Sequence, residues 1–344
     1  MAASRKPLPN RPVGAVVADA LARHVPPHAR LVLGLSGGLD SVALLHVLLL
    51  LRDRFPFELR VVHVHHGLSP HADAWADFCA RLCASHAVES SIHHVVITRD
   101  DAAGIEAAAR RERQRIFAAL DADFLLTAHQ QDDQAETLLL QLLRGAGPKG
   151  LAAMAELQSR PGWRAAQLRP LLGVTRAGLL DYAQSHGLTW VDDESNHDIR
   201  YRRNALRRQV MPLLAAHFPG SGATLARAAA LQADAADLLD DLARIDAETA
   251  IAGERLDCAL LAGLSRARAR NLLRYFIERH GQPMPNARRL DEALHQLRDA
   301  GRDARVCVGL GRVELWRFRG GAYLVAPAPA PAAPVRWRGE ASLW

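Results

Sequence analysis

The chain of 344 residues is poor in cysteine, lysine and aromatic residues, and it has no long apolar run. Four cysteines in a chain of this length do not make a disulfide framework, and no Cys-x-x-Cys pair supports a zinc ribbon or dithiol redox site. The longest apolar stretch, residues 42–51, is far shorter than the ~20 residues that span a bilayer. The N-terminus lacks the apolar core of a signal peptide. We therefore expect a cytoplasmic protein with no membrane partner.

Lysine is nearly absent, since Lys6 and Lys149 are the only two among 43 basic residues. We interpret this skew as genome base composition, so a single arginine does not by itself indicate a site. The net charge of +6 is unevenly spread: residues 1–199 carry −2 and residues 200–344 carry +8. The second half therefore suits a polyanionic partner, with a solvated basic surface as the alternative.

The first 218 residues alternate apolar strands with helical segments. This alternation predicts an α/β fold with a doubly wound parallel sheet, which binds ligands at the carboxyl ends of its strands. Strands are expected at 31–35, 59–67, 91–97 and 123–128, and helices at 42–51, 72–86, 105–120 and 132–144.

Composition changes suggest three parts. PGSG at 219–222 predicts a boundary, which makes 1–218 the first domain. Residues 219–326 are expected to form a mainly helical domain with a β-hairpin at 305–326. The Pro/Ala-rich stretch and the residues after it (327–344) are expected to be a linker and the start of a third domain, either truncated or absent.

A Gly-rich segment, LGLSGGLDS at 33–41, connects an expected strand to an expected helix. Gly37 and Gly38 permit positive φ, and their N–H groups, with the following helix N-terminus, form a nest for an anion. Asp40 would repel a phosphate unless Mg²⁺ lies between them, so the segment predicts a metal-bridged nucleotide. It is neither a Walker A loop nor a GxGxxG loop. A tight turn without a ligand is the structural alternative.

The segment TAHQQDDQAET at 127–137 follows another expected strand. Its residues His129, Asp133 and Glu136 have the i, i+4, i+7 spacing that predicts one helix face. Carboxylates there can bind Mg²⁺ or an ammonium, or accept a proton from an amine. Acidic residues that favour a helix N-terminus would explain one aspartate but not the whole face.

Three further segments carry polar residues. HVHHGL at 63–68 ends a strand; a metal site there lacks a carboxylate or thiolate at ligand spacing, so we interpret it as a polar strand end beside a nucleotide pocket. Arg110 and Arg113, at helical spacing, are expected to contact phosphate, with a solvated, salt-bridged helix as the alternative. The segment at 190–212 begins acidic and has five arginines between 200 and 208, which suits recognition of a zwitterion and a phosphate.

The Gly-rich segment resembles the PP-loop of the N-type ATP pyrophosphatases, which cleave ATP to AMP and pyrophosphate. A narrower resemblance rests on the ordered set SGGLDS, HVHHGL, EAAARRER, TAHQQDDQAET, RGAGPKGL, RPLL and DDESN…RRN. Together these motifs resemble the tRNA(Ile)-lysidine synthetase family, closely over residues 30–212 and loosely to about 325. Gln114, His65 and Gln130 depart from the family pattern.

The resemblance implies ATP-dependent ligation of free L-lysine to the wobble cytidine of a CAU-anticodon tRNA(Ile), through an adenylated cytidine. It implies Mg²⁺ at Asp40 and Asp133, and catalytic roles for Asp133, Glu136, Asp40 and Arg110. ATP binding is implied for Ser36, Gly37, Gly38, Leu39, Asp40, Ser41, His63, Arg110 and His129. Lysine or tRNA binding is implied for Asp133, Glu136, Asp193, Asn196, Arg203 and Arg207.

The implied mechanism is chemically reasonable, because an AMP ester turns the poor leaving oxygen of cytosine into a good one. Lysine must lose a proton before it attacks, and Asp133 or Glu136 would accept it. The alternatives are a PP-loop tRNA thiolase, for which the cysteine spacing is wrong, and a non-catalytic RNA-binding protein. A homodimer is one assembly that the sequence allows.

Overall fold

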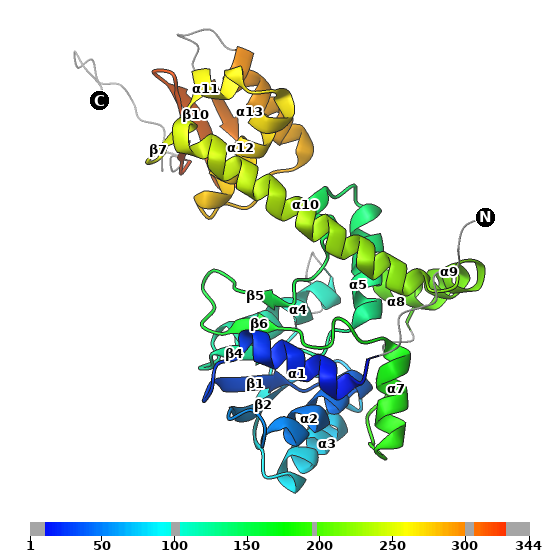
Figure 1. Ribbon diagram of the computed structural model, residues 1–344. Helices are drawn as coiled ribbons and strands as arrows, with labels where there is room; N and C mark the ends of the chain where they lie inside the picture. The colour runs from blue at the N-terminus through cyan, green and yellow to red at the C-terminus, as the bar shows by residue number, and fades with distance from the viewer. Residues whose placement is uncertain (1–10, 98–103, 195–197, 300–305, 328–344) are drawn as a thin grey trace. The chain divides into compact units, whose positions relative to one another are not determined.

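The computed structural model describes residues 11–97, 104–194, 198–299 and 306–327 (Figure 1). Contacts divide the chain into two compact units, 1–233 and 234–344, and each is described by itself. The division falls inside a 30-residue helix, α10 (Ser221–Ala250). The domain boundary expected at 218 stays a prediction, and nearly all of the expected linker at 327–344 lies outside the described residues.

The first unit has a six-stranded sheet of order β3-β2-β1-β4-β6-β5, parallel except for the last pair. The predicted doubly wound α/β fold is therefore confirmed. Its strands are β1 (Arg30–Gly34), β2 (Glu58–His65), β3 (Glu89–His94), β4 (Phe124–Leu126), β5 (Leu157–Gln158) and β6 (Ala166–Leu168). Its helices before α10 are α1 (Val13–His24), α2 (Leu39–Leu51), α3 (Ala72–Ser85), α4 (Ile105–Ala118), α5 (Gln131–Leu142), α6 (Pro148–Leu151), α7 (Arg176–Ser185), α8 (Arg202–Ala205) and α9 (Met211–His217).

Both faces of this sheet are covered, because the strand residues alternate between two apolar clusters. Leu31 and Leu33 of β1 pack with α1, α2 and α7, whereas Val32 packs with Phe117 of α4. Helix α2 is apolar nearly all round and almost wholly buried, as expected for a helix in the centre of the fold.

The order of the strands indicates where a ligand-binding site would lie. Strand β1 pairs with β2 on one side and with β4 on the other, so the sheet order reverses between β1 and β4. In open parallel sheets, ligands bind at such a switch point, outside the carboxyl ends of the strands. The Gly-rich segment follows β1 and the segment 127–133 follows β4, so both meet at this edge.

A π turn, η2 (Leu206–Val210), separates α8 from α9. Pro212 follows it, lacks an N–H and would crowd the carbonyl of Arg208 in a regular α-helix. The wider turn relieves that conflict, and π turns of this kind are frequent at functional sites.

The second unit has an antiparallel sheet of order β7-β8-β11-β10-β9, and its described core also contains residues from the end of α10 and from the helices that follow it. The predicted helical domain with a hairpin is confirmed, but residues 305–326 hold three strands rather than two. The elements are β7 (Ile251–Ala252), β8 (Arg255–Asp257), α11 (Cys258–Gly263), α12 (Arg266–Arg279), α13 (Ala287–Asp299), β9 (Val306–Gly309), β10 (Glu314–Phe318) and β11 (Gly321–Val325).

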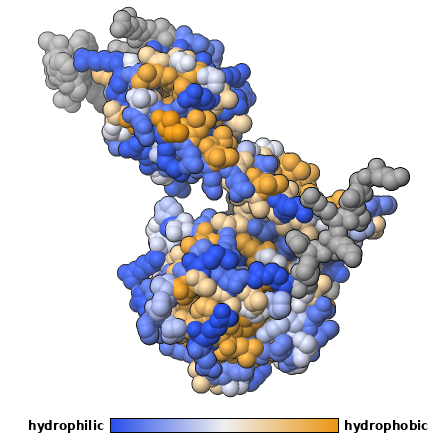
Figure 2. All heavy atoms as spheres, in the orientation of Figure 1, coloured by the Kyte–Doolittle hydropathy of each residue, from blue (hydrophilic) through white to orange (hydrophobic). Residues whose placement is uncertain are grey.

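The surface mixes residue types. In the view of Figure 2, hydrophobic residues lie between stretches of hydrophilic ones. Within the described part of the chain, no helix combines the length and the apolar character needed to cross a membrane.

Candidate active site

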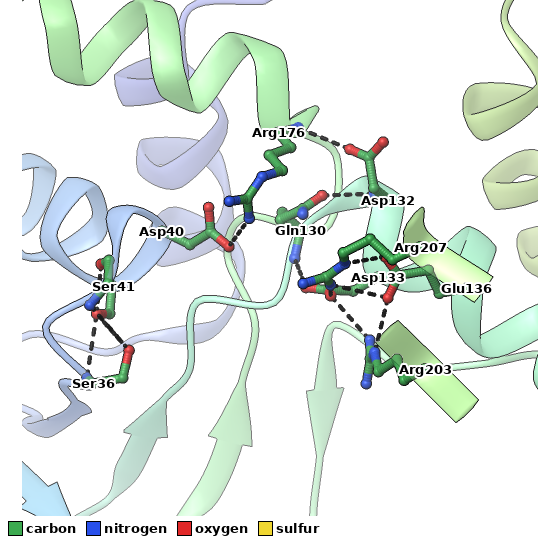
Figure 3. A network of polar contacts seen from close by, with 11 residues as sticks. Ser36, Asp40, Ser41, Gln130, Asp132, Asp133, Glu136, Arg176, Arg203 and Arg207 are labelled. Atoms are coloured by element: carbon green, nitrogen blue, oxygen red, sulfur yellow. Dashed lines mark hydrogen bonds and ion pairs between the residues drawn. The ribbon is translucent and has the colours of Figure 1, made fainter. Parts of the chain in front are cut away.

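The Gly-rich loop between β1 and α2 has the backbone shape of an anion nest. Gly37 has φ +83°, and a Cβ there would lie 3.2 Å from the Cys79 sulfur, so the position requires glycine. The Ser41 hydroxyl donates to the Gly38 carbonyl (3.0 Å) and lies 3.1 Å from the Ser36 hydroxyl. These bonds hold the loop in shape, with the N-terminus of α2 directed at the carboxyl edge of the sheet (Figure 3).

Neighbouring segments support the loop. The Val191 N–H donates to the Gly37 carbonyl (2.9 Å), which connects the loop to the start of the 190–212 segment. His63 lies 2.8 Å through Nδ1 from the Leu35 carbonyl, and burial lowers its pKa. The Leu39 side chain is buried, so only its backbone can face a ligand. The structure thus places His63 and Leu39 beside the loop as supports, and their roles in ATP binding stay predictions.

Asp40, in the first turn of α2, is the weakly partnered acid of the site. Burial raises the pKa of its carboxyl to about 6, although the positive charge of Arg176 opposes the shift. Arg176 lies 3.7 Å from Oδ2, and Oδ1 is buried without a hydrogen-bond partner among the described residues (Figure 3). An unpaired buried carboxylate oxygen is poised for a cation.

Helix α5 carries the second acidic group. It begins at Gln131, so His129 lies in the loop before it, and the expectation that His129 shares a helix face with Asp133 and Glu136 was wrong. The reason is a capping box: the Gln130 side chain accepts from the Asp132 N–H (2.6 Å), and Asp133 Oδ2 accepts from the Gln130 N–H (3.0 Å).

Two arginines from the 190–212 segment reach these acids. Arg203 donates to Glu136 (2.8 Å) and Asp133 (2.9 Å), and Arg207 donates to Glu136 (2.6 Å) and Asp133 (3.0 Å). Glu136 is 1% exposed, so this is a largely buried cluster of two acids and two arginines (Figure 3). We call these four residues the α5 cluster. Both arginines contact carboxylates here, and the roles in lysine or tRNA binding that the resemblance implies for them stay predictions.

His129 lies beside this cluster. Burial lowers its pKa to about 3, and the nearby charges of Arg169, Arg203, Arg113 and Arg110 lower it further. Its Nδ1 is 3.0 Å from the Thr127 hydroxyl. The ring is therefore neutral at physiological pH. Arg110 is exposed on α4, and its roles in ATP binding and catalysis stay predictions.

The remaining predicted positions are less informative. Asp193 is half-buried before a short turn, and Asn196 lies outside the described residues. The neighbouring Glu194 accepts from the Ser69 hydroxyl (3.2 Å).

The sequence did not single out Arg176, Thr127, Gln167 or Arg169 as part of the site. Arg176 begins α7, and its backbone N–H donates to Asp132 (2.8 Å). Gln167 lies in β6, Thr127 and Arg169 directly follow β4 and β6, and sequence spacing carries no signal for the proximity that strand pairing creates.

Helix α12 of the second unit carries four arginines within nine residues, at 266, 268, 270 and 274, and their charge is partly neutralised. Arg268 pairs with the buried Asp246, and Arg270 lies 2.7 Å from Asp291. Arg266 and Arg274 have no ion pair among the described residues, which leaves these two of the four for contact with a polyanion.

Comparison with known proteins agrees with this geometry. A family described as "PP-loop domain" matches residues 12–214, and one described as "TilS substrate binding domain" matches residues 256–323. A tRNA(Ile)-lysidine synthase of Azoarcus sp. (strain BH72) is 49% identical over 321 residues, which are 92% of this chain and 70% of the relative. That of Nitrosomonas europaea is 44% identical over 327 residues, 94% of this chain and 71% of the relative.

Among solved structures, the U34-tRNA thiolase NcsA from Methanococcus maripaludis has a TM-score of 0.53 at 20% identity, covering 63% of this chain and 77% of that one. At that identity the likeness supports the fold alone. The sequence relatives are far closer, and they match across both units. The chain therefore belongs to the tRNA(Ile)-lysidine synthase family.

Proposed function

We propose that the protein ligates L-lysine to the wobble cytidine of the CAU anticodon of tRNA(Ile), with ATP adenylating the cytidine first. The products are lysidine, AMP and pyrophosphate, and the modified base reads AUA instead of AUG. The observation that carries the proposal is the meeting, at one switch point, of an anion nest after β1 and the buried acids of α5 after β4.

The nest and Asp40 suit the pyrophosphate end of ATP. Backbone N–H groups at positions 37–39 and the N-terminus of α2 favour an anion. Asp40 fits Mg²⁺, because Oδ1 is buried and unpartnered. When bound, Mg²⁺ would neutralise phosphate charge, and in nucleotide sites it needs only one or two protein carboxylates.

Asp133 fits Mg²⁺ less well than Asp40 does. Its Oδ1 accepts from Arg203 and Arg207, and its Oδ2 accepts from the Gln130 N–H. Among the described residues, no group of three or more potential ligands gathers as a metal site. We assign Asp133 to lysine rather than to the metal.

The α5 cluster suits a cationic substrate. Asp133 and Glu136 already hold two guanidinium groups, so they are shaped and charged to accept a cation. The ammonium of lysine would compete with or join these arginines. Asp133 is more exposed than Glu136, at 8% against 1%, so it is the better placed of the two to take the proton of the attacking amine.

The cysteines argue against thiolase chemistry. Cys79, Cys83 and Cys258 are buried, and burial raises the pKa of Cys79 to about 12. A thiol with that pKa is not a nucleophile at neutral pH. Cys307 is exposed but belongs to β9 of the second unit. A purely RNA-binding role leaves the buried acids and the nest without a purpose.

One assay distinguishes these functions. The protein is incubated with ATP, Mg²⁺, labelled lysine and a tRNA(Ile) transcript bearing CAU, beside a matched transcript with uridine at the wobble position. We expect AMP release and label in the RNA only with all components and only with the cytidine transcript. Incorporation of sulfur from a sulfide donor, or RNA binding without AMP release, would contradict the proposal.

Replacement of Asp133 tests its role within this reaction. Asp133→Asn should leave tRNA binding intact and abolish lysidine formation, because the amide neither attracts the ammonium nor accepts its proton. Asp181→Asn is the matched control, since Asp181 is an exposed acid on α7. Normal turnover in Asp133→Asn would exclude Asp133 as the proton acceptor.

A further inference from the structure

Behind the site lies a buried arginine with no carboxylate partner. Arg169 directly follows β6 and is 3% exposed. It donates to the Ala155 carbonyl (2.7 Å) and to the side-chain oxygens of Gln158 (3.0 Å) and Gln167 (2.7 Å). No described acid forms an ion pair with it. Burial lowers its pKa to about 10, which leaves the guanidinium charged at neutral pH.

The arginines determine the orientation of the Gln167 amide. Arg169 and Arg160 both donate to one atom of that side chain, at 2.7 and 3.0 Å. An arginine has only donors, so the shared atom must be the amide oxygen. The Nε2 group of Gln167 therefore faces the Thr127 hydroxyl, 3.0 Å away, and donates to it.

The orientation of the Gln167 amide determines the role of the Thr127 hydroxyl in its hydrogen bond with His129. Its oxygen accepts from Gln167, so its single hydroxyl hydrogen is available to His129 Nδ1 at 3.0 Å. Thr127 and Gln167 are both buried, so water does not replace these bonds. The described residues offer the Thr127 hydroxyl hydrogen no other acceptor, so the bond that satisfies it makes Nδ1 of His129 the acceptor and places the proton of the neutral ring on Nε2. No described residue accepts a hydrogen bond from Nε2.

We propose that Arg169, acting through Gln167 and Thr127, fixes His129 as the neutral tautomer that carries its proton on Nε2. The inference rests on the proposed function for its chemical meaning: the ligand is an anionic phosphate oxygen of ATP or of the adenylated cytidine. A neutral Nε2–H can donate to that oxygen without transferring a proton, so His129 stabilises charge and does not act as a general acid. Arg169, Gln167 and Thr127 are positioning residues.

The arrangement also explains why this arginine lacks an acid. A carboxylate beside Arg169 would cancel its charge and would favour protonation of the nearby imidazole. The charged groups that act on His129 are instead Arg169, Arg203, Arg113 and Arg110, all of which disfavour the imidazolium.

The tautomer can be measured without substrate. The full chain is labelled with ¹⁵N-histidine, and the resonances of His129 are assigned by their loss in His129→Asn. We expect Nε2 to have the chemical shift of a protonated nitrogen and Nδ1 that of an unprotonated one, unchanged from pH 5 to pH 8. A proton on Nδ1, or a charged ring in that range, would overturn the proposal.

Thr127 offers the sharpest variants. Thr127→Val removes the hydroxyl at constant shape and should yield a mixture of tautomers, with kcat lowered ~10–100-fold and the KM for ATP little changed. Thr127→Ser keeps the hydroxyl and should restore both. Thr249→Val, which removes a hydroxyl bonded to a backbone carbonyl in α10, is the control. If His129 keeps the same tautomer in Thr127→Val, the hydrogen bonds through Thr127 do not fix it.

The tautomer measurement tests this inference, and the lysidine assay tests the proposed function, so the two can fail separately. If the wild-type protein shows the Nε2–H tautomer but forms no lysidine, the tautomer is supported and the proposed function is rejected. If lysidine forms normally and Thr127→Val matches the wild type in kcat, the catalytic use of the tautomer is rejected.

Discussion

The two acidic groups of the first unit differ in how their charge is balanced. Asp40 in α2 has one arginine at 3.7 Å and a buried oxygen without a partner. Asp133 and Glu136 in α5 each accept from two arginines. In sequence, all three are acids near the N-terminus of a helix that follows a strand. The structure separates an acid with one arginine at 3.7 Å from a pair of acids with two arginines within hydrogen-bond distance.

The difference teaches how one site can take two unlike substrates. An under-balanced carboxylate favours a proton or a metal ion, which explains why the pKa of Asp40 is raised to about 6. A balanced cluster exchanges one cation for another and keeps its net charge low. The first arrangement suits a metal-bound triphosphate, and the second suits an ammonium.

The largest expected effect on stability comes from removing the two arginines that neutralise the acids of α5. Arg203→Gln with Arg207→Gln leaves Glu136 buried without its cations, which should destabilise the protein by about 3–5 kcal/mol at pH 8. Urea unfolding at pH 8 measures the loss. Adding Glu136→Gln should recover most of the stability; equal stability of the double variant and the wild type would mean that the cluster contributes nothing.

The next effect tests which acid serves the metal. ATP with Mg²⁺ at 100 times its Kd should stabilise the wild type by about 2.7 kcal/mol. Asp40→Asn should lose the Mg²⁺-dependent part of that gain, and Asp133→Asn should keep it. Thermal shifts with ATP, with and without a chelator, make the measurement. The comparison breaks down if Asp133→Asn loses the metal dependence and Asp40→Asn retains it.

A smaller effect follows from the raised pKa of Asp40. The folded state holds this proton more tightly than the unfolded state, so ionisation of Asp40 opposes folding as the pH rises from 4 to 6. Asp40→Asn should be more stable than the wild type by about 1–2 kcal/mol at pH 8, and the two should converge near pH 4. The gain is limited because a quarter of the side chain stays exposed. Unfolding curves across pH check it, and a destabilised variant at pH 8 would contradict the raised pKa.

The smallest effect concerns Arg176. Its side chain is half exposed and 3.7 Å from Asp40, so Arg176→Gln should change the stability by less than about 1 kcal/mol. Its charge lowers the pKa of Asp40, so the variant should move the pH midpoint of the Asp40 effect upward. The pH dependence of unfolding, compared with that of Arg176→Gln plus Asp40→Asn, isolates this contribution. A downward movement would show that Arg176 does not act on Asp40.

Local patterns in the sequence predicted much of this architecture. Alternating strands and helices indicated the parallel sheet, and the Gly-rich segment indicated the nest, because both depend on neighbouring residues. The pairing of Arg203 with Glu136, 67 residues apart, could not be predicted, since five arginines in one segment look alike until the fold selects two. The start of α5 was expected within one residue, but the helix face assigned to His129 was wrong, because the i, i+4 spacing continues back past Gln130 whereas the capping bonds of Gln130 begin the helix after it.

The series of hydrogen bonds that connects Arg169 to His129 through Gln167 and Thr127 could not be predicted from the sequence either. Thr127 directly follows β4 and Gln167 lies in β6, and the pairing of these two strands brings positions 40 residues apart into contact. Nothing in the local pattern of either strand indicates a hydrogen bond at its end.

The π turn at 206–210 has a consequence for how the gene can change. A π turn holds one residue more than an α turn needs. Deletion of Gln209 would close the turn to α geometry and bring the ring of Pro212 against the carbonyl four residues before it. The length of the segment between Arg207 and Pro212 is therefore constrained, even though the side chains of Arg208, Gln209 and Val210 are exposed and free to vary in type.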